Sequence, residues 1–155
     1  MSELNPSSIA EALQGVWHLH RWEITYDDGR PTTYPFGPDA TGLIHYTQDG
    51  GMSACIARHS RPRLSSDSVR SAPPAEQMAA FESFFQYAGT FVTRVQDGKK
   101  QVVHNVTHAL NPNFVGSQQI RNVALAPDGT LTLSASDLIP GTQSLRHHRL
   151  IWRRA

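Results

Sequence analysis

Four Asp-Gly pairs constrain this chain more than any other feature: Asp28-Gly29, Asp49-Gly50, Asp97-Gly98 and Asp128-Gly129. Asp-Gly is a strong signal for a tight hairpin turn, because glycine adopts positive φ angles without strain and aspartate tolerates them. Runs rich in valine, isoleucine, threonine, tyrosine and tryptophan flank the pairs. The spacing therefore predicts an antiparallel meander, and a meander of this length most simply closes into a barrel.

The pattern predicts one all-β domain over residues 1–155, with its core at about 15–154 and eight strands in an up-and-down barrel. We expect a short N-terminal helix at 5–14 and a helix at 74–86, inserted between the third and fourth strands. The second helix carries Met78, Phe81, Phe84 and Phe85, which would pack on the barrel or form a lid over a ligand. The expected strands are 16–26, 41–47, 51–57, 87–96, 101–109, 117–126, 130–135 and 145–152.

The lengths of the connections predict two different barrel ends. The turns at Asp49-Gly50, Asp97-Gly98 and Asp128-Gly129 all fall at one end, which they would pinch shut. The long connections, at 27–40, 58–86, 110–116 and 136–144, all fall at the other end. Because an eight-stranded barrel is wide enough for one small ligand, and ligand sites favour barrel mouths, we expect a ligand cavity that opens among the long connections.

Charge and cysteine content narrow the class of protein. The formal net charge of +1 gives no general attraction to nucleic acid or to anionic lipid. Cys55 is the only cysteine, so no internal disulfide is expected. The first residues lack the pattern of a secretion signal, and no segment approaches the ~20 apolar residues of a membrane span. We expect a cytoplasmic protein with no nucleic-acid partner and no membrane span; the sequence leaves a homo-oligomer open.

Several segments resemble a known family. Gly15-Val-Trp17 opens the first expected strand, and Arg153-Arg154 close the last one. This is similar to lipocalins, in which a Gly-x-Trp tryptophan plugs the barrel floor under an arginine from the final strand. The chain resembles the bacterial lipocalin-like domain family more closely. The segments that carry this resemblance are Trp17–Glu23, Tyr34–Gly42, Tyr46–Ala54, Tyr87–Thr90 and Pro112–Gly116, together with Arg121.

The resemblance implies a calycin-type barrel and leaves the function open. The chain has no Thr-Asp-Tyr motif at the turn after the sixth strand, where Ala126-Pro-Asp-Gly129 stands instead, and no secretion signal. Extracellular transport, the usual role of lipocalins, is therefore not implied. The lipocalin-like family is largely without assigned activity, and some proteins of similar architecture are cyclases or isomerases that act on hydrophobic metabolites.

Hairpin pairing predicts which side chains face the cavity. A turn at Asp97-Gly98 pairs Phe91 with His104 and Tyr87 with His108, and a second hairpin would pair His108 with Gln119. Because side chains alternate between the two faces, a slip of one residue would invert every assignment. Extending the alternation from Trp17 also places Arg21 and Glu23 inside. The expected ligand-binding residues are Tyr46, Tyr87, Phe91, His104, His108, Asn113, Gln119 and Arg121.

Two functions of different class fit such a cavity. In the first, the barrel binds a largely hydrophobic metabolite, and His104, Gln119 and Arg121 orient its polar or carbonyl end. In the second, the protein is an isomerase, cyclase or lyase in which His104 moves a proton and Arg121 stabilises oxyanion charge, so these two residues are the candidate catalytic groups. A third alternative, an interaction module, has no sequence feature in its favour.

No metal or cofactor is expected. His104 and His108 would lie about 13 Å apart on one strand, too far to share one ion. His18 and His20 fall on the face opposite Trp17. The chain has neither a phosphate loop nor a dinucleotide fingerprint.

Overall fold

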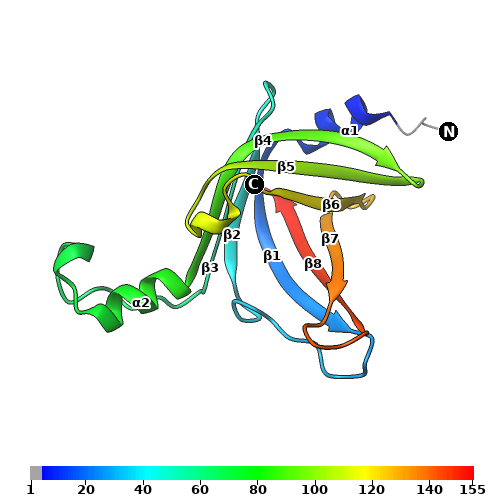
Figure 1. The fold of residues 1–155 in the computed structure, drawn as a ribbon. Coiled ribbons are helices and arrows are strands. Elements are labelled where there is room, and N and C mark those ends of the chain that lie inside the picture. Colours follow the sequence, from blue (N-terminus) through cyan, green and yellow to red (C-terminus); the bar gives the residue numbers. More distant parts are fainter. Residues whose placement is uncertain (1–4) are drawn as a thin grey trace.

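The computed structural model describes residues 5–155, and its eight strands form one closed antiparallel barrel in sequence order (Figure 1). The predicted eight-stranded barrel with two helices is confirmed. The helices are α1 (Pro6–Leu13) and α2 (Pro74–Glu82). The strands are β1 (Gly15–Tyr26), β2 (Thr41–Tyr46), β3 (Gly51–Ala57), β4 (Phe84–Gln96), β5 (Lys99–Ala109), β6 (Gln118–Leu125), β7 (Leu131–Leu138) and β8 (Leu145–Arg154).

The hairpin turns form where the Asp-Gly pairs predict them. Asp97 has a φ of 51° and Gly98 a φ of 73°, the two positive values that a two-residue turn of the tightest hairpin class needs. This turn sets the register in which Phe91 pairs with His104. Gly50 and Gly129 also have positive φ values, in the turns between β2 and β3 and between β6 and β7.

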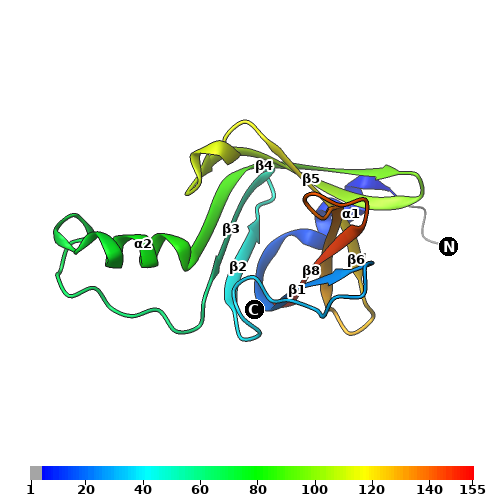
Figure 2. The same cartoon turned by 60° about the horizontal axis from the view of Figure 1, so that its bottom comes forward.

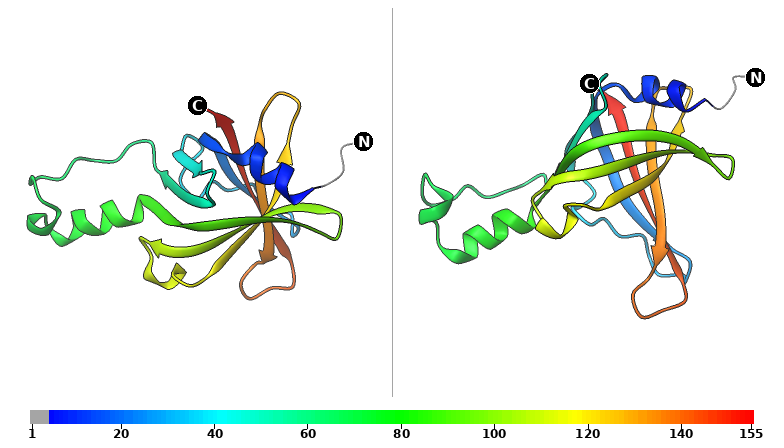
Figure 3. Two further views of the ribbon diagram at one scale, coloured as in Figure 1. Left: turned by 90° about the horizontal axis from the view of Figure 1, so that it is seen from above. Right: turned by 45° about the horizontal axis from the view of Figure 1, so that its top comes forward.

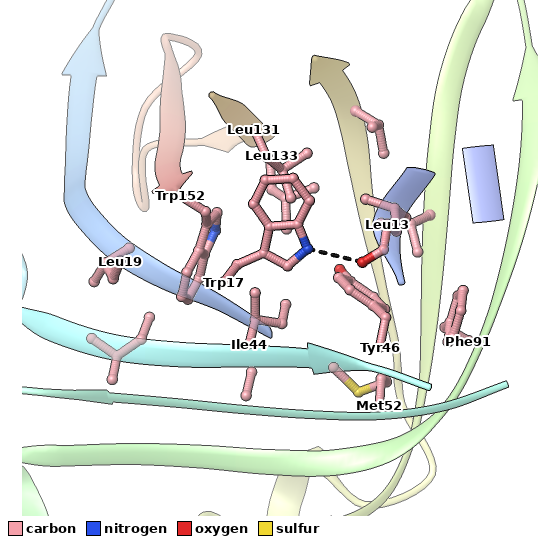
Figure 4. Packing of buried hydrophobic residues seen from close by; sticks show 14 of the residues in the cluster. Leu13, Trp17, Leu19, Ile44, Tyr46, Met52, Phe91, Leu131, Leu133 and Trp152 are labelled. Atoms are coloured by element: carbon pink, nitrogen blue, oxygen red, sulfur yellow. Dashed lines mark hydrogen bonds between the residues drawn. The ribbon is translucent and has the colours of Figure 1, made fainter. Parts of the chain in front are cut away.

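The narrow end of the barrel is closed by α1. Asn5 caps this helix by accepting a hydrogen bond from the Ser7 amide, and Leu13 is buried at its other end. The Trp17 indole donates to the Leu13 carbonyl over 2.8 Å, beside Trp152 and Ile44 (Figure 4). The helix end, the indole and the surrounding side chains therefore form a solid floor.

Arg154, the last residue of β8, contacts both Trp17 and the end of α1 on the outer side of this floor. Its guanidinium lies 4.1 Å from the centre of the Trp17 ring and donates to the carbonyl groups of Ala12 and Gln14. Because the C-terminal carbonyls of a helix carry partial negative charge, a cation there is favourable. The tryptophan and arginine that the family resemblance pairs are thus in contact.

The second helix differs from its prediction. It ends at Glu82, so Phe84 and Phe85 begin β4 instead of continuing a helical stripe. None of the α2 residues, all of which the structure describes, is buried, and Met78 and Phe81 are exposed. The helix extends away from the barrel as an arm (Figures 2 and 3), so it neither packs on the wall nor covers the mouth. Within residues 5–155, neither helix has the length and hydropathy of a membrane span.

Candidate ligand-binding cavity

A cavity of about 490 Å³ occupies the barrel above the Trp17 floor. This volume lies within the ~300–1,000 Å³ typical of small-molecule sites. Its wall is mostly aliphatic and aromatic, with polar side chains at two places. The lining residues are Trp22, Ile44, Ala54, Ile56, Phe85, Tyr87, His104, Phe114, Gln119, Ile120, Arg121, Leu133, Ala135, Ser136, Asp137, His148, Leu150 and Trp152.

His104 is held between two tyrosines. Its Nε2 lies 2.8 Å from the Tyr46 hydroxyl, and its Nδ1 lies 2.6 Å from the Tyr87 hydroxyl. The three residues come from β5, β2 and β4, and Tyr46 and His104 are each only 1% exposed. Tyr87 and His104 reach the cavity wall, whereas Tyr46 lies behind them in the core.

Burial determines the protonation states of this triad. Desolvation, assisted by the nearby Arg121 charge, lowers the pKa of His104 to about 3. Desolvation also raises the pKa of Tyr87 to about 12 and raises that of Tyr46 well above its ordinary value. At neutral pH all three side chains are therefore uncharged. Both ring nitrogens of His104 are engaged by tyrosines, so the ring has no free lone pair for a substrate proton.

Arg121 and Gln119 complete the polar end of the cavity, which we define as Tyr87, His104, Gln119 and Arg121. Both residues lie on β6 and line the cavity, as predicted. The Arg121 guanidinium donates to the Ile120 carbonyl over 2.9 Å and approaches the Gln119 side-chain oxygen at 3.4 Å. Arg121 therefore stands partly buried beside Tyr87, with donor groups available to a ligand.

Gln119 and Arg121 face the cavity as the alternation predicts, although the predicted pairing is wrong. Gln119 pairs with His104 instead of His108, because β5 and β6 are joined by a longer connection that contains a short helix at Pro112–Phe114. The error is four residues, an even number. Since side chains alternate with a period of two, it leaves the inward face unchanged.

His108, an expected ligand-binding residue, is exposed and lies outside the cavity. Ala88 pairs with His108 but Gly89 pairs with Val106, so Thr107 is an extra residue in β5. This β-bulge reverses the alternation, and the prediction of regular pairing through Tyr87 and His108 is wrong.

Three other expected ligand contacts also lie elsewhere. Asn113 is exposed, and its amide bonds to the Asn111 side chain; its neighbour Phe114 enters the cavity instead. Tyr46 and Phe91 belong to the packed core, where their rings meet edge to face at 4.9 Å. Tyr46 therefore acts on the cavity only through His104.

A second bulge turns Trp22 into the cavity. Leu19 pairs with Trp152 and Arg21 with Ile151, which leaves His20 as an extra residue in β1. The prediction that Arg21 and Glu23 face inward is therefore wrong, and Trp22 lines the cavity against Phe36 and Phe85. The indole nitrogens of Trp22 and Trp152 are buried without a hydrogen-bond partner among residues 5–155.

Sequence reasoning missed a second polar group on the cavity wall, formed by Asp137 of β7 and His148 of β8. The His148 Nε2 lies 3.5 Å from the Asp137 carboxylate, which also accepts two hydrogen bonds from Arg146. Partial burial lowers the pKa of His148, and the hydrogen bonds from Arg146 lower that of Asp137. Alternation counted back from the buried Trp152 would have placed His148 inside.

Metal binding finds no support in the described part of the chain. Residues 5–155 contain no cluster of three or more histidine, cysteine, aspartate or glutamate side chains in a ligating arrangement. His18 and His20 are exposed on the outer face of β1.

Comparison with known proteins agrees with this architecture. No curated protein matches the chain. A protein family described as the lipocalin-like domain matches residues 14–155, which include all eight strands and the cavity. The chain is therefore a member of the lipocalin-like domain family.

Proposed function

We propose that this protein binds a small, largely hydrophobic metabolite inside the barrel and orients its polar or carbonyl end with Tyr87 and Arg121. The observation that carries the proposal is the cavity of about 490 Å³ inside the barrel, with a mostly apolar wall and the polar end formed by Tyr87, His104, Gln119 and Arg121. Apolar walls supply affinity, and a few directed polar groups supply orientation. Membership of the lipocalin-like family, whose barrel fold suits small-molecule binding, supports the same function.

A cavity-filling variant tests this proposal. Ala54 of β3 is buried and lines the cavity, so Ala54→Phe places a ring in the ligand's space. We expect the variant to bind methyl octyl ketone, a simple apolar ketone, at least about tenfold more weakly than the wild type. Binding is followed by tryptophan fluorescence, since Trp22 and Trp152 line the cavity.

Ser53→Phe is the matched control, because Ser53 is the exposed neighbour of Ala54 on the other face of the same strand. It adds the same ring outside the barrel and should leave the affinity unchanged. Equal affinities for both variants, with circular dichroism showing intact barrels, would rule out the cavity as the binding site.

A second candidate function, isomerase, cyclase or lyase chemistry on a hydrophobic metabolite, is favoured by one observation. His148 lines the cavity beside the Asp137 carboxylate. Its side chain is partly exposed, whereas His104 is fully buried. A histidine oriented by a carboxylate is a suitable general base. Arg121 and Tyr87 would then stabilise the negative charge that develops on a carbonyl oxygen.

The test is the exchange of protons next to the carbonyl of a cyclic enone for solvent deuterium, followed by NMR. His148→Asn should slow a protein-catalysed exchange by about a hundredfold or more. His147→Asn is the control, because His147 does not line the cavity and its Nε2 bonds to Asp27, which also lies outside the lining. Exchange that is no faster with the wild-type protein than in buffer would eliminate this candidate for that substrate class.

A further inference from the structure

The buried triad of Tyr46, His104 and Tyr87 has a direction that follows from counting protons. A phenol has one proton to donate, and a neutral imidazole has one N–H and one lone pair. With neutral groups, the three side chains therefore form a chain in which each hydrogen bond has one donor. Only two orders are available, one running from Tyr46 towards Tyr87 and the other running back.

Tyr46 decides between the two orders. Its hydroxyl is fully buried, and within residues 5–155 its one hydrogen-bond partner is His104 Nε2. If Nε2 carried the ring proton, the Tyr46 hydroxyl would accept that bond and its own proton would be left without an acceptor in the core. An unsatisfied buried donor costs about 1–3 kcal/mol. The favoured order has Tyr46 donating to Nε2, which places the ring proton on Nδ1.

The order determines what the Tyr87 hydroxyl does; Tyr87 is the tyrosine of the triad that lines the cavity. The Nδ1–H group donates to the Tyr87 oxygen over 2.6 Å, so the Tyr87 proton has to be donated elsewhere. The cavity is the space that Tyr87 faces. Arg121, which also lines the cavity, carries only N–H donors and cannot accept the Tyr87 proton. The Gln119 side-chain oxygen already lies 3.4 Å from the Arg121 guanidinium.

We propose that Tyr46, acting through His104, fixes Tyr87 as a hydrogen-bond donor, so that the polar end of the cavity selects ligands whose polar end is an acceptor, a carbonyl or a carboxylate. An ammonium group, which only donates, would meet further donors and the Arg121 charge. The inference rests on the proposed binding function and names its ligand class. Tyr46 is a positioning residue, because it lies in the core and does not line the cavity.

The charges facing the triad agree with this assignment. Arg121 is the charged group whose field acts on all three side chains, and it opposes a positive charge on the His104 ring. Asp137, the carboxylate on the cavity wall, is bound by Arg146 at the exposed mouth and does not reach the triad. The ring therefore stays neutral and keeps a single proton at neutral pH.

The first test needs no ligand. With nitrogen-labelled histidine, two-dimensional NMR shows which ring nitrogen of His104 carries the proton, because protonated and unprotonated nitrogens have well-separated shifts. We expect protonated Nδ1 and unprotonated Nε2 at neutral pH. In Tyr46→Phe the donor to Nε2 is gone, and we expect the other tautomer to become populated. A wild-type ring protonated at Nε2, or at both nitrogens, overturns the inference.

The second test measures selectivity with a matched pair of probes. Methyl octyl ketone and the amine in which CH–NH3⁺ replaces its carbonyl share one carbon skeleton. We expect the wild type to prefer the ketone, and Tyr87→Phe to reduce ketone affinity about tenfold with little change for the amine. Tyr46→Phe should also reduce ketone affinity, by a smaller factor, although the substitution changes no residue of the cavity wall.

The two tests separate the inference from the binding function. If neither probe binds the wild type, the proposed function fails for this ligand class while the tautomer result stands alone. If the ketone binds but Tyr87→Phe weakens ketone and amine equally, binding in the cavity survives and the donor role of Tyr87 is wrong.

Discussion

His104 is a residue whose burial is tolerated because both ring nitrogens have partners. Tyr46 and Tyr87 satisfy the ring at 2.8 and 2.6 Å, so the imidazole is buried at little hydrogen-bonding cost. Adding a proton would replace a neutral ring by a buried cation beside Arg121, which explains why the pKa of His104 falls to about 3. The residue therefore orients Tyr87 and stays neutral.

This lowered pKa predicts a pH dependence of stability. Between about pH 3 and pH 6.5 the His104 ring is protonated in the unfolded chain and neutral in the folded protein. The contribution of the neutral ring is thus fully present above pH 6.5, and it is lost as the pH falls towards 3, by up to about 1.4 kcal/mol per pH unit. Urea unfolding at a series of pH values measures it.

The matched pair of variants for that measurement is His104→Gln and His108→Gln. A glutamine side chain does not titrate, so His104→Gln should lose this part of the acid destabilisation, although its stability at neutral pH is lower. His108 is exposed, and its replacement should keep the wild-type slope. Parallel pH profiles for the wild type and His104→Gln would contradict a neutral buried ring.

At the scale of single elements, the bulge in β5 decides which side chains reach the cavity. A Cβ atom on Gly89 would overlap the Asn105 carbonyl oxygen and crowd the Thr107 amide, so only glycine allows β5 to approach β4 so closely at this point. The bulge ends the regular alternation after Val106 and directs His108 outward. One glycine thus keeps the His108 side chain out of the polar end of the cavity.

Gly89→Ala should therefore destabilise the protein by about 2–4 kcal/mol or more, because neither strand moves freely. The control is Gly98→Asn in the β4–β5 turn, where φ is 73° and nothing lies within 4 Å of an added Cβ. Asparagine tolerates positive φ, so this change should cost less than about 1 kcal/mol. Chemical denaturation measures both, and equal costs would show that close strand approach does not explain Gly89.

Across the whole molecule, the two ends of the barrel have different roles: one is closed and stabilises the fold, and the other is open to a ligand. Tight turns, α1 and the contact between Trp17 and Arg154 close one end. At the open end, Phe85 at the start of β4 and Phe114 in the β5–β6 connection line the cavity. The arm formed by α2 leaves that end clear. A closed floor and an accessible mouth are what a container for one small ligand needs.

The sequence predicts this fold well because local signals determine it. The Asp-Gly turns fix the register of neighbouring strands, and Trp17 and Arg154 identify the floor. The site is predicted less well because bulges at His20 and Thr107 reverse the alternation, and no local pattern marks an extra residue in a strand. Sequence reasoning places Tyr87, His104, Gln119 and Arg121 on the cavity wall, leaves Trp22 as a possibility, and misses Asp137 and His148.

The most direct test of binding inside the barrel is to locate methyl octyl ketone by intermolecular NOEs to a methyl-labelled protein. Binding in the cavity predicts contacts from the alkyl chain to the methyl groups of Ile44, Ile56, Leu133 and Leu150, which line it. A hollow of about 510 Å³ on the arm, lined by Leu64 and Val69, provides the internal comparison. Contacts to Leu64 and Val69, with none to the four cavity residues, would contradict the proposed function.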